Sequence, residues 1–248
     1  MDIEITTLAE RPELQGPMWQ MLDTWVEFVT HDPIAWAYIG RIVGELPEYV
    51  LVATDAEGEV VGRAFSVPLA MDVDGRRDLP AGGWDQVMLW AFSDLRHGRK
   101  PDIVSAIEIT VATGRQGQGI SGLMLAAMRD NVRRLGFDEL IAPVRPSAKS
   151  AEPLALIDEY AYRTREADGL PHDPWLRVHV RAGGVIEKVA PTSMTVTGSL
   201  DQWRTWTGLA FDTTGQVEVE GGLVPVHCEA ERGYGVYVEP NVWVRHRV

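Results

Sequence analysis

Hydrophobic residues recur along the first half of the chain with two different periods, which predict helices and strands in turn. Between residues 12 and 30 the apolar positions follow one another at intervals of three and four, as on one face of an amphipathic helix. Residues 49–54 and 60–71 are apolar segments that flank the turn residues 55–58, so they predict a β-hairpin. The other elements expected here are a strand over 3–7, helices over 33–46, 84–95 and 119–135, and strands over 104–111 and 137–144.

The pattern becomes looser in the second half of the chain. Asp173 and Pro174 are typical of a helix start, and the glycines 183–184 end this helix after Ala182. The other expected elements are a short helix over 154–165, strands over 185–189 and 193–197, an amphipathic segment over 200–206, and two or more strands that include the aromatic stretch 234–243.

These elements predict a mixed α and β fold in which helices flank a central, mostly antiparallel sheet. We expect residues 1–197 to form the core and residues 198–248 to form a strand-rich C-terminal extension packed on it. The strands within 218–248 could pair with those of a second copy, so a homodimer is one expected state.

The net charge narrows the choice of partners. The chain has a formal net charge of -13 and a sequence pI near 4.9, which disfavours binding to nucleic acid or to anionic membranes. Its start lacks the pattern of a secretory signal, no apolar run has the length of a membrane helix, and Cys228 is the single cysteine. We therefore expect a cytoplasmic protein. The histidines show no metal-ligand spacing, so no metal is expected.

A glycine-rich turn between a strand and a helix is the most informative stretch of the sequence. It runs from Ile107 to Gly122 and reads IEITVATGRQGQGISG. Glycines let consecutive backbone amides converge, and the helix start adds unpaired donors, so this arrangement is typical of a phosphate site. Arg115 supplies a local positive charge.

Two classes of phosphate-binding protein fit this turn. Gly117–Gly122 matches G-x-G-x-x-G, and Asp138 or Glu139 follows at a distance suited to a ribose contact, as in dinucleotide-binding proteins. However, the motif comes after a region of helices and a hairpin, and no repeated strand–helix units follow it, which a doubly wound sheet needs.

The turn more closely resembles motif A of the GNAT (GCN5-related N-acetyltransferase) superfamily. In that motif a strand ending in Val precedes [Gln/Arg]-x-x-Gly-x-[Gly/Ala] and a helix; here Val111 ends the strand and Gln116–Ser121 fills the pattern, with Ser121 as the small last residue. The order of elements from residue 3 to about 197 is also similar to that of the family. The resemblance implies a sheet that splays where acyl-CoA binds, with acetyl-CoA or another acyl-CoA as co-substrate.

The resemblance also implies where coenzyme A lies. The pantetheine arm would run beside the backbone of Ile109, Thr110 and Val111. Backbone amides would hold the pyrophosphate, and they belong to Gln116, Gly117, Gln118, Gly119, Ile120 and Ser121. The thioester would lie where strands 104–111 and 137–144 separate.

Two residues are candidates for the chemistry. Glu108 is a charged residue in an apolar strand, and family members often place a Glu on this strand as general base. The alternative is that Glu108 is solvated or paired with an arginine. His179 stands four residues before Gly183, where the family commonly has a Tyr that protonates the leaving thiolate. The alternative for His179 is a buried histidine bonded to a backbone carbonyl.

Residues 145–172 form a longer link than the family usually has. Pro143-Val144-Arg145 stands where some family members carry a Glu-Val-Arg base, so that version of the mechanism is excluded. The link could form a wall of the acceptor pocket, or it could be a solvated surface loop. Its candidate substrate-facing residues are Arg145, Lys149, Tyr160, Tyr162 and Arg165.

The function that these features favour is direct acyl transfer from coenzyme A to a small amine, catalysed by an N-acyltransferase. Two alternatives stay open from the residues alone. The same fold could bind acyl-CoA without turnover, because the usual Tyr is replaced, and the dinucleotide motif would indicate an oxidoreductase.

Overall fold

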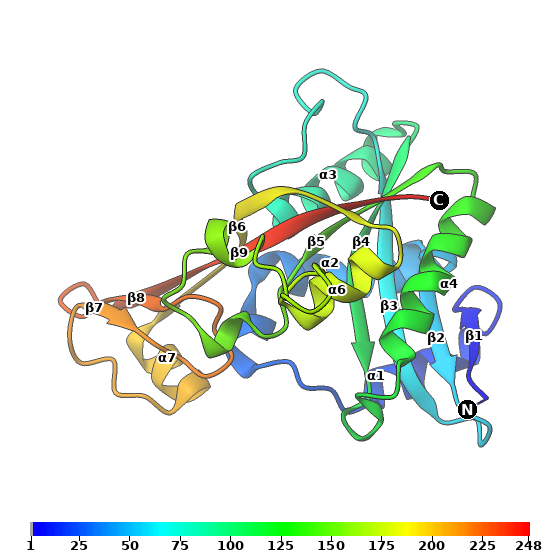
Figure 1. The fold of residues 1–248 in the computed structure, drawn as a ribbon. Coiled ribbons are helices and arrows are strands. Elements are labelled where there is room, and N and C mark those ends of the chain that lie inside the picture. Colours follow the sequence, from blue (N-terminus) through cyan, green and yellow to red (C-terminus); the bar gives the residue numbers. More distant parts are fainter. Residues whose placement is uncertain (1) are drawn as a thin grey trace.

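A computed structural model describes residues 2–248, in which nine strands form one sheet (Figure 1). The strand order is β1-β2-β3-β4-β5-β9-β8-β7, and β6 pairs with β9. Among the strand pairs of residues 2–248, β4 and β5 alone are parallel, so the predicted mostly antiparallel sheet is confirmed. The strands are β1 (Glu4–Thr7), β2 (Val50–Thr54), β3 (Val60–Leu69), β4 (Ile103–Val111), β5 (Glu139–Val144), β6 (Val185–Ser199), β7 (Gly215–Val217), β8 (Val226–Glu229) and β9 (Tyr234–Arg247).

Helices cover both faces of the sheet. They are α1 (Gln15–Gln20), α2 (Pro33–Glu45), α3 (Gly83–His97), α4 (Ile120–Arg134), α5 (Ile157–Tyr160), α6 (Pro174–Arg181) and α7 (Leu200–Thr207). In Figure 1, α4 and α6 lie in front of the sheet and α2 and α3 lie behind it. β3 is buried on both faces, which explains why its sequence is apolar without interruption by charge except at Arg63. Among residues 2–248, none of the helices combines the length and the apolar composition needed to cross a membrane.

The prediction of one helix over residues 12–30 is wrong. This segment forms a 3-10 turn at Pro12–Leu14, the short helix α1, an extended stretch and a second 3-10 turn at Glu27–His31. In the stretch between, Asp23 accepts a hydrogen bond from the amide of Trp25 at 3.1 Å, and the carbonyl of Leu22 accepts the amide of Thr113 at 3.1 Å. Contacts with a distant turn thus replace the helical hydrogen bonds that the apolar spacing favoured.

The second half differs from expectation in two elements. The predicted helix over 154–165 is helical only at α5, a single turn. The two strands predicted over 185–189 and 193–197 are one long strand, β6, whose pairing with β9 shifts register at two places, between Ile186 and Lys188 and between Ala190 and Met194. These irregularities interrupted the alternation and made one strand look like two.

β9 lies inside the sheet rather than beside it. One edge pairs with β6 along most of its length, and the other edge pairs with β5 through residues 242–247 and with β8 through residues 234–236. The predicted boundary at residue 197 falls within β6, and the sheet continues across it. The segment from α7 to β8 leaves the sheet and returns to it, anchored by Trp203, which is fully buried against Phe28 (ring centroids 5.7 Å apart) and Phe211 (5.6 Å).

Candidate active site

β4 and β5 pair only briefly before they separate. Their aligned residues are Val104 with Leu140 and Ser105 with Ile141. Directly beyond this point β4 contains a bulge: Ile107 has no opposite residue on β3. The indole N–H of Trp84 donates to the carbonyl oxygen of Ile107 at 2.9 Å, which stabilises the bulge. The predicted splay of the sheet therefore begins at Ile107.

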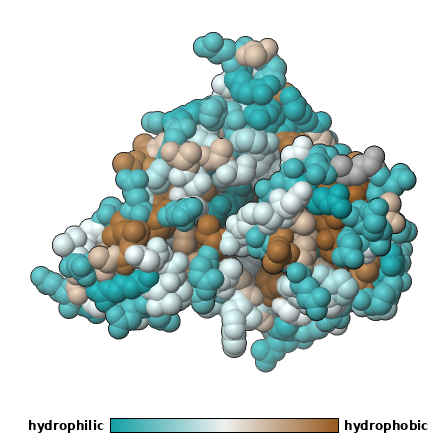
Figure 2. All heavy atoms as spheres, turned by 90° about the horizontal axis from the view of Figure 1, so that it is seen from below, coloured by the Kyte–Doolittle hydropathy of each residue, from teal (hydrophilic) through white to brown (hydrophobic). Residues whose placement is uncertain are grey.

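A cavity of about 1020 Å³ occupies this opening. Its walls come from β4, the glycine-rich turn, the extended stretch after α1, the end of β5 and α6. Figure 2 views the molecule from below and shows that apolar surface lies among polar side chains on the lower face of the molecule. All but one of the predicted site residues line the cavity, namely Glu108, Ile109, Thr110, Val111, Gln116, Gly117, Gly119, Ile120, Ser121 and His179; Gln118 does not.

The glycine-rich turn presents free backbone donors to the cavity. Gly117 and Gly119 have φ of 75° and 82°, values that favour glycine, and α4 begins directly after Gly119 without a side-chain cap. Within residues 2–248, no backbone or side-chain acceptor is bonded to the amides of residues 116–121. A Cβ at Gly117 or Gly119 would meet no atom within 4 Å, so the space above the turn is open. Free amides at a helix start facing open space fit a diphosphate.

Side chains around the turn contribute less positive charge than the sequence suggested. Arg115 forms an ion pair with Asp55, which is almost fully buried. The side-chain amide of Gln116 donates to the hydroxyl of Thr24 at 3.2 Å, which ties the turn to the stretch after α1. Anion binding at this turn therefore depends mainly on backbone amides and the helix start.

The stretch after α1 closes over β4. The indole N–H of Trp25 donates to the hydroxyl of Thr110 at 3.1 Å, and the guanidinium of Arg145 lies 5.8 Å from the ring centre of Trp25. Trp25 thus stands between β4 and the residue that follows β5.

Glu108 belongs to a buried ion-pair group. Its Oε1 accepts from Nε of Arg63 at 2.7 Å, and Nη2 of Arg63 donates to Asp23 at 2.8 Å. The exposed fractions of the side chains are 8% for Arg63, 12% for Glu108 and 23% for Asp23, so all three are largely shielded. Burial by itself lowers the pKa of Arg63, but the two carboxylates outweigh burial and raise it, so the arginine stays charged. The group carries two negative charges and one positive charge, and Oε2 of Glu108 has no partner among residues 2–248.

His179 lies on α6, whose start is capped by Asp173 as predicted. The ring is 2% exposed, and its Nδ1 lies 2.9 Å from Nε2 of His246 on β9. Burial, and then the neighbouring His246, lower the pKa of His179 to about 3, and burial followed by Arg129 lowers the pKa of His246 to about 4. Both rings are therefore neutral at neutral pH, with one donating and the other accepting.

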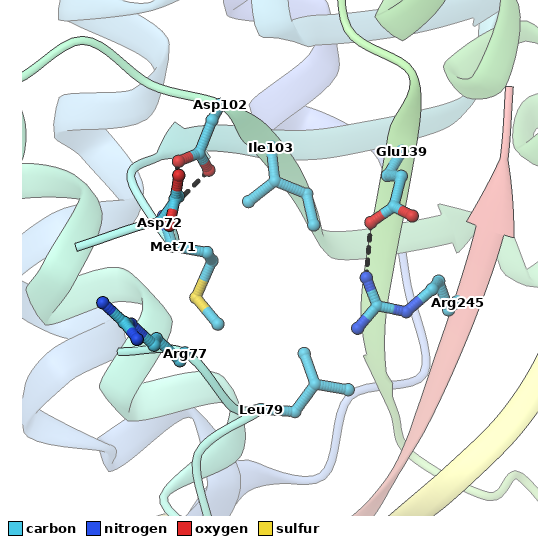
Figure 3. A pocket seen from close by; sticks show the side chains of 8 residues that line it. All are labelled: Met71, Asp72, Arg77, Leu79, Asp102, Ile103, Glu139 and Arg245. Carbon is cyan, nitrogen blue, oxygen red and sulfur yellow. Dashed lines mark hydrogen bonds and ion pairs between the residues drawn. The ribbon is translucent and has the colours of Figure 1, made fainter. Parts of the chain in front are cut away.

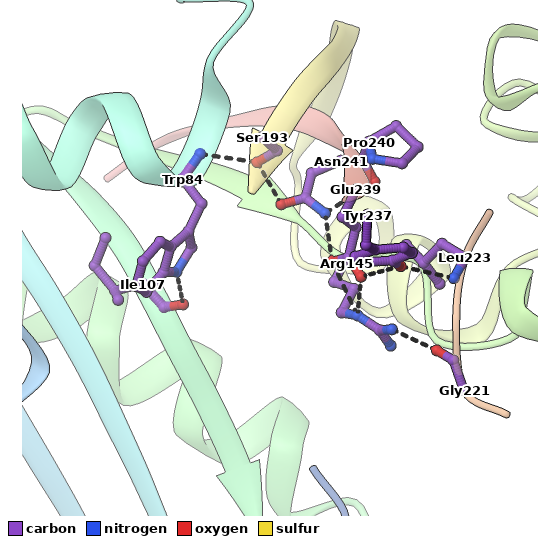
Figure 4. A network of polar contacts seen from close by, with 10 residues as sticks. All are labelled: Trp84, Ile107, Arg145, Ser193, Gly221, Leu223, Tyr237, Glu239, Pro240 and Asn241. Atoms are coloured by element: carbon purple, nitrogen blue, oxygen red, sulfur yellow. Dashed lines mark hydrogen bonds and ion pairs between the residues drawn. The ribbon is translucent and has the colours of Figure 1, made fainter. Parts of the chain in front are cut away.

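A second polar network surrounds Glu239, which lies on β9 between the residues that pair with β8 and those that pair with β5 (Figure 4). Nε of Arg145 lies 3.0 Å from both carboxylate oxygens of Glu239, a residue of β9 with no exposed surface. Glu239 also accepts hydrogen bonds from the hydroxyl of Tyr237 at 2.6 Å and from the side-chain amide of Asn241 at 3.2 Å. Nη2 of Arg145 donates to the carbonyl of Gly221 at 2.6 Å. The network fixes the guanidinium of Arg145 at the cavity wall.

The link over 145–172 contributes only its first part to the cavity. Arg145, Ser147 and Ser150 line it. Lys149 is fully buried and donates to backbone carbonyls, including those of Glu152 at 2.7 Å and Leu223 at 2.8 Å, so it holds the link to the segment before β8. The other three candidates of the link do not line the cavity: Tyr160, bonded to Asp173; Tyr162, which is exposed; and Arg165, paired with Asp168.

Sequence reasoning missed several residues of the site, namely Asp23, Trp25, Arg63, Glu239 and Asn241. Arg63 and Glu239 had a readable signal, because Arg63 is the one charge in β3 and Glu239 is the one charge in the apolar stretch 234–244 of β9. Asp23 and Trp25 had none, since the apolar spacing placed them in a helix that does not form.

A smaller cavity of about 420 Å³ lies elsewhere, between the loop after β3 and the start of β5 (Figure 3). There Arg245 is already paired with Glu139 and Glu187, and the Asp102 carboxylate accepts the amides of Met71 and Asp72 at 2.8 Å. Residues 2–248 contain no cluster of three or more His, Cys, Asp or Glu side chains suited to a metal ion.

Comparison with known proteins identifies the lineage. No protein-family model matches the chain. The arginine N-acetyltransferase avaD of Aspergillus versicolor is 31% identical over 98% of this chain and 93% of its own length. Two solved structures share the fold: the loading GNATL domain of CurA from Lyngbya majuscula (TM-score 0.62, 16% identity, 100% of this chain and 98% of that one) and the GNAT-like decarboxylase GphF in complex with isobutyryl-CoA (TM-score 0.53, 15% identity, 100% and 99%).

These similarities agree with the splayed sheet, the bulge in β4 and the free amides of residues 116–121. The dinucleotide interpretation fails because the sheet is antiparallel apart from β4 and β5 in the described residues. Identity at this level across almost the whole chain shows common descent, and the protein belongs to the GNAT superfamily, in which it is an N-acyltransferase that uses acyl-CoA as co-substrate.

Proposed function

We propose that the enzyme transfers an acetyl group from acetyl-CoA directly to the amine of a small basic amino acid such as arginine, with no covalent acyl-enzyme. The observation that carries the donor assignment is the row of free amides at residues 116–121 above an open space. These amides would hold the diphosphate, and the free edge of β4 at Ile109, Thr110 and Val111 would hold the pantetheine arm.

Glu108 is the proposed general base. Acyl transfer requires a neutral amine, so an ammonium acceptor first gives one proton to the base; the nitrogen then attacks the thioester carbonyl, the C–N bond forms, the C–S bond breaks, and the second proton lost by nitrogen balances the one that the sulfur takes up. Glu108 borders the cavity; its Oε1 is fixed by Arg63, while its Oε2 is unpartnered among residues 2–248. The Arg63 contact thus holds the carboxylate in place and leaves one oxygen to accept the proton, directly or through water.

His179 is proposed to lie beside the leaving sulfur. With a pKa near 3 the ring does not store a proton as imidazolium at neutral pH. Its contribution would be a hydrogen bond from the neutral ring toward the developing thiolate, with His246 fixing the tautomer.

Three features favour a cationic acceptor with a guanidinium group. The arginine N-acetyltransferase relative is named for such an acceptor. The Asp23–Arg63–Glu108 group carries one excess negative charge beside the cavity. Trp19 and Trp36, with exposed fractions of 42% and 86%, stand at the cavity rim, where indole rings can stack on a guanidinium.

A thiol-release assay tests the proposal directly. The full-length protein with acetyl-CoA should release CoA on addition of arginine, and mass spectrometry should detect acetylarginine. Binding of acetyl-CoA without release of CoA across a broad panel of amines would mean a non-catalytic acyl-CoA-binding role. Equal release of CoA with amines that lack a basic side chain would reject the proposed acceptor class.

The cytoplasmic location, the homodimer through residues 218–248 and the division at residue 197 stay predictions. Fractionation and light scattering test the first two, and limited proteolysis near residue 197 tests the third. Because β6 crosses that point, we expect proteolysis there to be slow.

A further inference from the structure

Arg145, the residue that follows β5, is a cation that has hydrogen-bond donors without an acceptor among residues 2–248. Arg145 borders the cavity, and 21% of its side chain is exposed. Its Nε is bonded to Glu239 and its Nη2 to the carbonyl of Gly221, while Nη1 has no acceptor among residues 2–248. A guanidinium nitrogen cannot accept a hydrogen bond, so its N–H groups need an acceptor from water or from a ligand.

Three arginines border this cavity, and their partners differ. Arg63 is bonded to two carboxylates, so its charge is more than offset. Arg115 is paired with Asp55 beside the glycine-rich turn. Arg145 has one carboxylate partner, and that partner shares its charge with Tyr237 and Asn241. Asp55 likewise accepts two further donors, the backbone amides of Glu57 and Glu59, so Arg115 and Arg145 are both less neutralised than Arg63, and of the two only Arg145 lies away from the glycine-rich turn.

The surroundings of Arg145 hold it rigidly. Glu239 has no exposed surface and fixes the guanidinium plane through Nε, and the ring of Trp25 lies 5.8 Å away. Asp85, a half-buried acid near Glu239, has its pKa raised to about 8 by burial, then by Asp32 and Glu239, so it adds little negative charge at neutral pH. A fixed, partly unpaired guanidinium is suited to binding a carboxylate.

Trp25 connects this cation to the proposed base. Its indole N–H is bonded to Thr110, which lies two residues from Glu108 and so on the same side of β4. An acceptor lying along Trp25 thus meets the free donors of Arg145 at one end and the acidic group at the other.

We propose that Arg145 binds a carboxylate of the acceptor, so that the enzyme selects α-amino acids over the corresponding decarboxylated amines. This inference rests on the proposed acyl transfer to an amine at this cavity, but not on the identity of the acceptor side chain. Arg145 is a specificity residue in this role, because it contacts a part of the acceptor that does not react.

Matched acceptor pairs test the inference with the full-length enzyme and acetyl-CoA. The pairs are arginine with agmatine, lysine with cadaverine, and phenylalanine with phenethylamine. We expect kcat/KM for the amino acid to exceed that for its decarboxylated partner by about 10- to 100-fold, as for one charge-assisted pair of hydrogen bonds. Equal or better use of the decarboxylated amines would overturn the inference, even if arginine is not the preferred side chain.

Variants assign the preference to Arg145. Removing Arg145 alone leaves Glu239 buried and unpaired, so the comparison is made between E239Q and the double variant R145Q/E239Q. E239Q should keep the preference for the amino acid, and the double variant should lose it, because its kcat/KM for arginine should fall about 10- to 100-fold more than its kcat/KM for agmatine. R165Q, a surface change in the same link, is the control. A double variant that loses both acceptors equally, with E239Q unaffected, would show that Arg145 acts in structure only.

If none of the amines is acetylated, isothermal titration in the presence of CoA still decides the inference. Arginine should then bind more tightly than agmatine to E239Q and no more tightly to the double variant. This result would separate failure of the proposed acyl transfer from failure of the carboxylate site.

Discussion

The two halves of the cavity are built in different ways. The donor side is a single continuous turn whose free amides belong to residues 116–121, and side chains add little to it. The acceptor side is made of charged and aromatic side chains from residues 23, 25, 63, 108, 145 and 239, which only the fold brings together. Backbone donors can be specified by a short motif, whereas a side-chain constellation depends on long-range packing.

The largest effect is expected from a substitution on the acceptor side, which should lower kcat and leave CoA binding on the donor side unchanged. Replacing Glu108 by Gln keeps the shape but removes the proposed proton acceptor, so kcat should fall by about 10²- to 10³-fold. The dissociation constant for CoA should change less than about twofold, because Glu108 is not part of the turn. A thiol-release assay measures kcat, and isothermal titration measures the dissociation constant for CoA. Unchanged kcat in a folded variant would remove Glu108 from the chemistry.

Stability should depend on pH through the buried histidines. Below about pH 6.5 His179 and His246 become protonated in the unfolded chain. In the folded protein they stay neutral, because their pKa values are about 3 and about 4. The free energy of unfolding should change little near pH 7. Between pH 7 and pH 5 it should fall, and the contribution of His179 alone to this fall is about 2 kcal/mol. Urea unfolding at the two pH values measures this.

His179→Gln provides the control for that prediction. It should unfold with a clearly smaller change between pH 7 and pH 5 than the parent chain, since the depressed pKa is gone. An identical pH dependence in both chains would mean that other groups dominate.

A glycine substitution tests the donor side. Gly119→Ala places a Cβ in open space but at φ of 82°, so it should cost about 1–2 kcal/mol of local strain and weaken CoA binding by about 5- to 30-fold. Gly114→Ala, in the same turn without a positive φ and with open space, is the matched control and should bind CoA almost normally. Equal affinities in both variants would argue against a backbone site.

The smallest effect is expected where the two sides meet. Trp25→Phe removes the hydrogen bond to Thr110 and keeps most of the ring beside Arg145. We expect KM for the acceptor to rise by about fivefold, as for the loss of about 1 kcal/mol, with CoA affinity unchanged. Steady-state kinetics with each substrate varied in turn makes the comparison. A change in CoA affinity instead would place Trp25 on the donor side.

The same contrast explains what could be predicted from sequence. The strand–turn–helix around residues 103–134 has its glycines, periodicity and helix end within one stretch, so the fold class and the donor turn could be predicted from it. The stretch after α1 could not, because its apolar spacing fits a helix while Thr113 and Thr110, far along the chain, hold it extended. The sequence marks Arg145 as a candidate, but it does not reveal the partner Glu239 on β9, which lies 94 residues away.

The position of β9 ties the working site to the completion of the fold. β9 is the last strand in chain order, yet it joins β5 to β6 and carries both Glu239 and His246. Until it docks, β5 and β6 each expose an unpaired edge to other chains, a known route to aggregation. Docking of β9 therefore has two results at once. It covers the unpaired edges of β5 and β6, and it positions Arg145 and His179 at the cavity, so a form without docked β9 is not active.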